Sequence, residues 1–129
     1  MVRPGTDCTI VAYGAALYTV MKALNPLNEQ GISCEVIDLR SLVPLDKACI
    51  LDSVRRTGRL VVVHEACRFC GFGAELAAMV AEEAFYALKG PVKRVGAPQS
   101  PVPTAPTHEK IFKPGPENVV LAVREAMGK

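Results

Sequence analysis

Tryptophan is absent from the 129-residue chain, and aromatic residues make up only 5% of it. Charged residues are also few, at 22%, whereas half of all residues are hydrophobic. This balance excludes intrinsic disorder and predicts an interior filled by aliphatic side chains. The length fits one compact domain with a single core. We assign residues 7–129 to that domain and residues 1–6 to a linker, and find no internal repeat.

Four other features are missing, and each excludes a class of protein. No apolar run approaches the roughly 20 residues needed to cross a bilayer. The net charge is +2, with 15 basic and 13 acidic residues mixed along the chain, so there is no basic stripe for nucleic-acid phosphates. The five cysteines lack the even number and spacing of a disulfide framework. No apolar signal core follows Met1. We expect a cytoplasmic protein, or a matrix protein in a mitochondrion, that binds neither nucleic acid nor membrane.

Four short runs rich in β-branched residues alternate with segments of helical length. They are residues 9–13, 34–39, 60–64 and 92–95. The alternation predicts a three-layer α/β domain, in which a mostly parallel sheet carries helices on both faces. The third run has no polar alternation, as expected for a central strand, whereas the fourth has polar residues at its middle and suits an edge.

Capping and breaking residues indicate where the helices begin and end. A first helix is expected from about Ala15, with Leu17, Val20, Met21 and Leu24 on its inner face, and Pro26 should kink or stop it. Asp46 is a good N-cap for a second helix that Gly58 closes. Pro116 suits the first turn of a last helix. The Pro-rich segment before that helix, residues 97–106, should follow an extended course.

Polar residues gather where the predicted strands end. In an open parallel sheet, ligands bind at the carboxyl ends of the strands. The sequence places Tyr13, Asp38, Arg40, His64 and Glu65 at that edge. Two interpretations are open, a small-anion or metabolite site and a structural cluster in which the charged residues pair among themselves. We favour the structural cluster of Asp38, Arg40, His64 and Glu65, because buried charges are usually kept by pairing.

A C-x-x-C motif, Cys67 to Cys70, follows His64 by three residues. Cysteine and histidine are the ligands that zinc prefers, and the same spacing occurs in redox dithiols. A closed zinc site needs four ligands, however, and the one other histidine, His108, lies in a distant loop. We therefore expect ordinary reduced cysteines here and assign no metal ligand, while a zinc or redox protein remains an alternative.

A second weak motif is the pair Gly71 and Gly73, which follows a strand and opens a helix. A dinucleotide-binding loop would need a third glycine where Leu76 stands. We expect these glycines to permit close approach of helix and sheet instead. No serine lies in a G-x-S-x-G context, and no cysteine lies in a nucleophile context. No catalytic or cofactor-binding residue is assigned.

Several segments occur in an order that is typical of one enzyme family. They are residues 31–46, 57–66, 71–75, 91–95 and 101–103. In these segments the chain resembles the β subunits of pyruvate, branched-chain 2-oxo acid and acetoin dehydrogenases, over about residues 5 to 127. The resemblance implies the fold of the transketolase C-terminal domain. The family's β subunit is longer, and its remaining part is a pyrimidine-binding domain that carries the glutamate that activates the cofactor.

The resemblance also implies a role in assembly. The full enzyme of this family uses thiamine diphosphate and Mg²⁺, decarboxylates a 2-oxo acid oxidatively and passes the acyl group to lipoyl-lysine. Its C-terminal β domain helps to form the β–β contact of a heterotetramer with α subunits, and it receives the peripheral binding domain of the acyltransferase. We expect this fragment to hold no cofactor and to be inactive alone. The alternative is a stand-alone module that binds a small anion or metabolite.

A third helix, expected over residues 73–88, carries the candidate interface. Four apolar residues fall on one stripe of this helix: Leu76, Met79, Val80 and Ala87. Phe85 and Tyr86 then point away from the sheet. We expect a symmetric homodimer with Phe85 and Tyr86 near the contact and Glu82 at its rim, available to a basic partner domain. The alternative is that the last helix or the Pro-rich segment covers this face.

Overall fold

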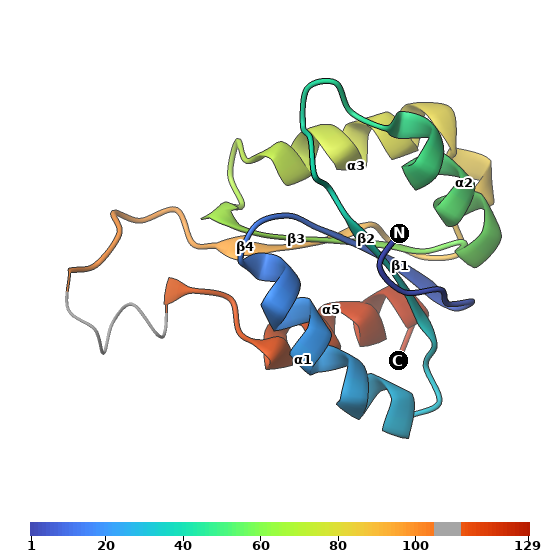
Figure 1. The fold of residues 1–129 in the computed structure, drawn as a ribbon, viewed down its shortest axis with the longest axis horizontal. Helices are drawn as coiled ribbons and strands as arrows, with labels where there is room; N and C mark the ends of the chain where they lie inside the picture. The colour runs from blue at the N-terminus through green and yellow to red at the C-terminus, as the bar shows by residue number, and fades with distance from the viewer. Residues whose placement is uncertain (105–111) are drawn as a thin grey trace.

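A computed structural model describes residues 1–104 and 112–129 of the chain. Within these residues four parallel strands form one sheet in the order β2-β1-β3-β4. The strands are β1 (Cys8–Ala12), β2 (Cys34–Asp38), β3 (Leu60–Cys67) and β4 (Lys93–Ala97). Helices lie on both faces of the sheet (Figure 1). The predicted three-layer α/β architecture is confirmed, as are the central place of the third strand and the edge position of the fourth.

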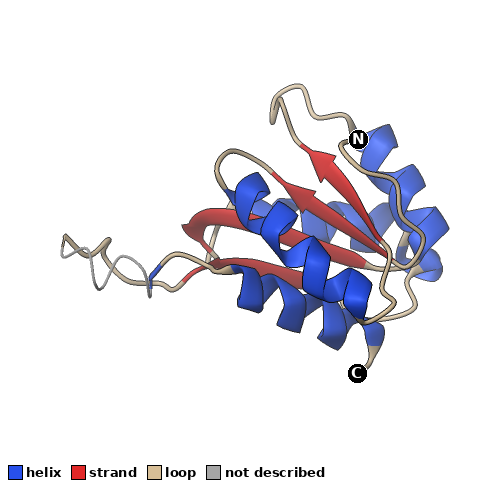
Figure 2. Ribbon diagram, turned by 60° about the horizontal axis from the view of Figure 1, so that its bottom comes forward, coloured by secondary structure: helices blue, strands red, loops and turns tan. Residues whose placement is uncertain are grey.

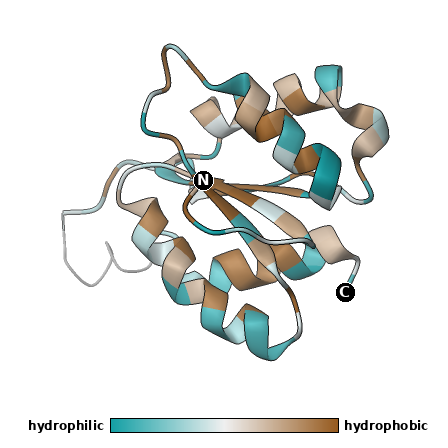
Figure 3. Ribbon diagram, turned by 45° about the vertical axis from the view of Figure 1, so that its right-hand side comes forward, coloured by the Kyte–Doolittle hydropathy of each residue, from teal (hydrophilic) through white to brown (hydrophobic). Residues whose placement is uncertain are grey.

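The strands alternate their side chains between two cores, as the pleat of a sheet requires. Val61, Val63 and Val95 pack toward one pair of helices, and Leu60 and Val62 pack toward the other pair. Figure 3 shows hydrophobic residues concentrated along the strands and hydrophilic residues on the outer sides of the helices. Both faces of the sheet are therefore buried, which explains the unbroken apolar run of the third strand.

One face is covered by α1 (Ala16–Glu29) and α5 (Pro116–Met127), which lie side by side in Figures 1 and 2. The helix α1 continues past Pro26 to Glu29, so of the two expected effects of this proline, a kink or a stop, the stop does not occur. Leu27, just beyond the proline, is completely buried, and its packing holds the last turn in place. Met21 was expected on the inner face but is 41% exposed, because it lies more than a quarter turn from the centre of the buried stripe.

The other face is covered by α2 (Lys47–Thr57) and α3 (Phe72–Glu83). Asp46 caps α2 by accepting a hydrogen bond from the Cys49 amide at 3.1 Å, and Gly58 ends it in a left-handed conformation. Both expectations are confirmed. The third helix, however, ends at Glu83 rather than near residue 88. The backbone of Ala84 leaves the helical region and its side chain enters the core, and a short 3-10 turn, Phe85–Ala87, follows.

Residues 1–6, expected to be a linker, partly join the sheet. Arg3 forms an antiparallel bridge with Val36 of β2, and the Val2 amide donates to the carbonyl of the same residue at 2.8 Å. At the other end, residues 98–104 run without helix or strand and project from the body of the domain (Figure 1). Ala105, Pro106 and His108 lie outside the described residues. No helix in the described ranges combines the length and apolarity that spanning a membrane requires.

Candidate functional site

The polar residues expected at the carboxyl edge of the sheet lie there, but they do not form one cluster. Asp38, at the end of β2, pairs with Arg40 at 3.0 Å. The Arg40 side chain is 87% exposed, whereas that of Asp38 is 11% exposed. Neither His64 nor Glu65, both on β3, has a hydrogen bond or ion pair to these two residues within the described structure. The structure therefore brings two of the four predicted cluster residues together.

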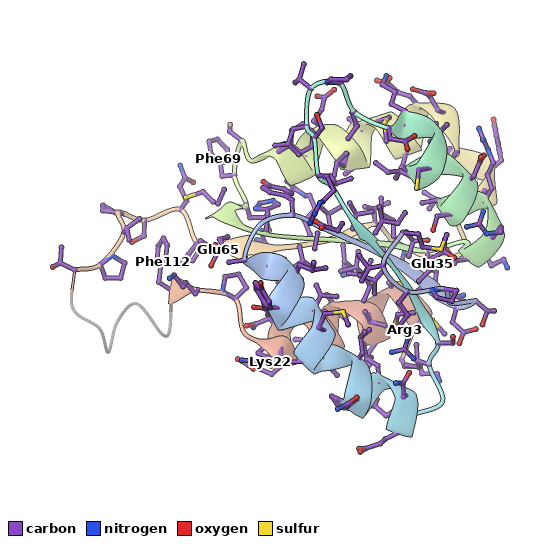
Figure 4. The ribbon with its side chains drawn as sticks, viewed as in Figure 1. Arg3, Lys22, Glu35, Glu65, Phe69 and Phe112 are labelled. Carbon is purple, nitrogen blue, oxygen red and sulfur yellow. The ribbon has the colours of Figure 1, made fainter. Side chains whose placement is uncertain are left out.

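The Glu65 side chain is exposed and makes no ion pair or hydrogen bond with any residue described. Figure 4 shows it at the end of the sheet from which the Pro-rich segment leaves, near Phe69 and Phe112. The internal pairing expected for this carboxylate is not formed. Water stabilises the charge of an exposed carboxylate, so Glu65 needs no ion-pair partner at the surface.

His64 is the only ionisable side chain in the described core of this edge, and it is completely buried. Its Nδ1 lies 3.0 Å from the Ala66 carbonyl oxygen. Because a carbonyl oxygen only accepts, Nδ1 carries the proton and donates it to that bond. The other ring nitrogen, Nε2, is buried and has no hydrogen-bond partner among the described residues. The imidazole is thus held as one tautomer.

Three glycines enclose the His64 ring. A Cβ atom built on Gly73 would lie 2.6 Å from Nε2, and one on Gly71 or Gly96 would lie 2.9 Å or 2.8 Å from Cε1. No side chain fits in these places without movement of the ring. The expectation that the Gly71 and Gly73 pair permits close approach of helix and sheet is confirmed, and the partner of that approach is the histidine.

Aromatic rings complete the enclosure. Tyr13 stacks on the imidazole with ring centroids 5.9 Å apart and an interplanar angle of 24°, and Phe72 meets Tyr13 edge to face at 6.1 Å. Burial lowers the pKa of His64 below its ordinary value; the bond to Ala66 opposes this shift and the positive charge of Arg94 adds to it. Burial likewise raises the pKa of Tyr13. His64 is therefore neutral and sealed, and it cannot reach a substrate in this state.

The sequence did not reveal this arrangement. Tyr13 and His64 were both expected at the strand ends, but no local pattern links them to Gly96 of β4 or to Phe72. These residues meet only because β1, β3 and β4 are neighbours and because α3 begins directly above the ring. The enclosure of His64 could have been predicted only from the strand order together with the positions of the glycines.

The cysteines of the C-x-x-C motif are both free thiols, Cys67 partly exposed and Cys70 exposed. The Cys67 thiol lies 3.3 Å from the Pro98 carbonyl oxygen, to which it donates. Cys70 has a positive φ of 53° in the turn before α3. In residues 1–104 and 112–129 no group of three or more histidine, cysteine or acidic side chains is placed to hold a metal ion.

The candidate interface residues lie beyond the end of α3. Phe85 is 60% exposed and Tyr86 is fully exposed, and the two rings meet edge to face with centroids 5.5 Å apart. They stand on the 3-10 turn, so the helical spacing used to predict their direction does not apply to them. Glu82 is exposed on α3. Two adjacent exposed aromatic side chains form an apolar surface without cover from the described part of the chain.

A comparison with known families and proteins adds a separate line of observation. The family model described as "Transketolase, C-terminal domain" matches residues 1–119. Among curated proteins, the β subunit of acetoin:2,6-dichlorophenolindophenol oxidoreductase from Cupriavidus necator is 42% identical over 98% of this chain and 38% of its own length. The 2-oxoisovalerate dehydrogenase subunit beta of Pseudomonas aeruginosa is 44% identical over 98% of this chain and 35% of its own.

Two further matches extend the comparison. The pyruvate dehydrogenase E1 component subunit beta of Leifsonia xyli is 42% identical over 98% of this chain and 37% of its own length. Among solved structures, a split gene transketolase described as an inactive beta4 tetramer superposes with a TM-score of 0.86 at 30% identity, covering 98% of this chain and 41% of that one. The chain thus spans little more than a third of the length of these curated relatives.

Proposed function

Because the chain belongs to the transketolase C-terminal domain family, we propose that it is the assembly domain of the β subunit of a thiamine-diphosphate-dependent 2-oxo acid dehydrogenase. The observation that carries the proposal is the identity of 42% to 44% with β subunits of acetoin-, 2-oxoisovalerate- and pyruvate-converting enzymes over 98% of the chain. The match covers 35% to 38% of those subunits, so the chain corresponds to one part of such a subunit.

In the proposed enzyme, the complete β subunit and an α subunit decarboxylate a 2-oxo acid oxidatively and transfer the acyl group to lipoyl-lysine. The pyrimidine-binding domain, the α subunit and the peripheral binding domain of the acyltransferase are the partners of this chain. Its own contribution is a rigid surface. The complete burial of His64 supports this division, because a buried imidazole is not arranged for proton transfer to a bound substrate.

Under this proposal the chain contributes no ligand to the cofactor or its metal. Mg²⁺ takes oxygen ligands from carboxylates or carbonyls in near-octahedral geometry. No group of three acidic, histidine or cysteine side chains with a suitable arrangement exists in the part of the chain that the structure describes. Thiamine diphosphate and Mg²⁺ therefore belong, under this proposal, to surfaces contributed by the other domains.

The proposal is tested by combining this chain with the other domains of the proposed enzyme. The chain is co-expressed with the pyrimidine-binding domain of a β subunit from a relative and with the matching α subunit, and the purified mixture is assayed for decarboxylation of pyruvate and of branched-chain 2-oxo acids. Co-purification and activity that require all the components are expected. Failure to co-purify with any α subunit and pyrimidine-binding domain of this family would contradict the proposal.

We also propose that the chain forms a symmetric dimer through the exposed ring pair of Phe85 and Tyr86. Its support is their exposure of 60% and 100%. The test is sedimentation of the wild type and of Phe85→Asp across micromolar concentrations. Phe69→Asp is the matched control, because Phe69 is 63% exposed at the opposite end of the sheet. A wild type that stays monomeric, or Phe85→Asp and wild type that dimerise equally, would defeat the dimer.

A further inference from the structure

A cavity of about 800 Å³ lies along the free edge of β4. Its floor is the backbone from Val92 to Gln99. Arg68 and Phe69, from the loop after β3, form one wall, and α5 residues including Leu121 form the other. The cavity is thus a groove between the loop after β3 and α5, with β4 at its floor, and Phe112, Lys113 and Pro114 also line it.

The backbone of β4 is bonded on one side only. Its ladder pairs Val61 with Lys93 and Val63 with Val95 on the side of β3. On the opposite side, no backbone hydrogen bond joins β4 to any other described residue. An extended peptide can add to such an edge, because its own amides and carbonyls complete the unused ladder.

The two faces of the groove differ in charge. Val95 packs with the α1 and α5 layer, so Lys93 faces that layer too, and Lys93 is neutralised by Glu125 at 2.7 Å. Arg94 faces the other layer, where its guanidinium donates to the carbonyl of Arg68 at 3.0 Å. Neither Arg68 nor Arg94 has an acidic partner within the described structure. Among the described residues, this face therefore carries positive charge without an acidic partner.

The other face combines the neutralised Lys93–Glu125 pair with apolar side chains. Leu121 of α5 is 56% exposed beside the groove, with Ala122 next to it in the lining. Side chains of an added strand alternate between the two faces with a period of two. A strand that fits would therefore carry acidic side chains toward Arg68 and Arg94 and apolar side chains toward Leu121.

Charge also decides between a second copy of this chain and a different partner. If two copies paired through β4, Arg68 and Arg94 of one copy would be brought toward the same cations of the other. Like charges across neighbouring strands destabilise the pair. The same cations attract a strand of opposite sign. We propose that the β4 edge binds an extended acidic segment of a partner protein, in which acidic and apolar residues alternate and which adds to the sheet beside β4.

The proposal is tested by fluorescence polarisation of a short, capped, labelled peptide that alternates glutamate with valine, titrated with the 129-residue chain. Saturable binding is expected. Arg68→Glu and Arg94→Glu, tested separately, should each weaken it by about tenfold or more, because each reverses a charge that faces the peptide. Arg55→Glu is the control, since Arg55 is also exposed but lies on α2 away from the groove, and it should bind as the wild type does. Arg68 is exposed, so its replacement is not expected to impair folding.

Two further peptides separate strand addition from simple charge attraction. A peptide in which lysine replaces glutamate should bind the Arg68→Glu, Arg94→Glu double variant better than it binds the wild type. A glutamate peptide with alternate amides N-methylated cannot complete the ladder, and its binding should be lost. Absence of binding by the first peptide, equal binding by the N-methylated one, or a dimer of the chain that protects β4 from hydrogen exchange would overturn the proposal.

Discussion

The two sides of the sheet are completed in different ways. Beside β2 the chain bonds its own edge, since Val2 and Arg3 pair with Val36, and the buried carboxylate of Glu35 pairs with Arg56 of α2. Beside β4 no strand follows within the described residues, and two arginines remain without an acidic partner. The β2 side is bonded by the chain's own first residues, whereas the described residues leave the β4 edge unpaired, and there we propose a partner. Changes at β2 should therefore cost stability, and changes at β4 should cost binding.

The largest effect is expected from Arg56→Ala, which breaks the ion pair on the β2 side. The Glu35 side chain is only 4% exposed, so the variant would leave a buried carboxylate without its partner. Arg56 itself is half exposed, which lets water replace part of the pair, and we expect a loss of about 2 kcal/mol in the free energy of unfolding. Urea denaturation measures it.

Arg55→Ala is the matched control for that variant. Arg55 is the neighbouring residue on α2, and its pair with Asp52 is exposed on both sides, at 52% and 63%. A loss below about 0.5 kcal/mol is expected. Equal losses for the two variants would show that burial of Glu35 does not distinguish the β2 side.

A second substitution tests the packing of the sheet beside β4. Gly73→Ala places a methyl group 2.6 Å from the His64 Nε2 atom, so ring or helix has to move. A loss of about 1 kcal/mol is expected, smaller than that of Arg56→Ala. In a His64→Ala background the ring is gone, and the same substitution should cost much less. Thermal unfolding of both single variants and the double variant gives the coupling energy. Additive losses would mean that Gly73 is required for a reason other than His64.

Lowering the pH should reduce the stability of the fold through the buried His64. The folded-state pKa of His64 is lowered by burial, so the unfolded chain binds its proton more readily. The stability contributed by the neutral ring is present above the unfolded pKa of about 6.5, and it is lost as the pH falls through the folded value. We expect this part of the pH dependence of urea midpoints to disappear in His64→Asn. An unchanged pH profile in that variant would assign the dependence to other groups, such as His108.

A small effect is also expected from Arg40→Ala. The Arg40 side chain is 87% exposed, and its partner Asp38 keeps access to water. A surface pair of this kind contributes less than about 1 kcal/mol. A loss as large as that of Arg56→Ala would show that the carboxyl edge depends on its ion pair as much as the β2 side does.

Local patterns in the sequence were sufficient to predict most of the helices and strands, but not the contacts between them. The β-branched runs located all four described strands, and Asp46 and Gly58 located both ends of α2. The end of α3 was missed, since Ala84 enters the core through a backbone change that no residue type announces. The pairing of Glu35 with Arg56 was missed because strand and helix meet only in the fold. The surroundings of His64 were missed for the same reason.

The central claim is that this chain assembles an enzyme without carrying its cofactor. Calorimetric titration of thiamine diphosphate and Mg²⁺ tests it most directly, first into the purified chain and then into the chain co-assembled with the pyrimidine-binding domain and the α subunit. We predict no binding heat from the chain alone and saturable binding by the assembly. Micromolar binding by the chain alone would contradict the claim.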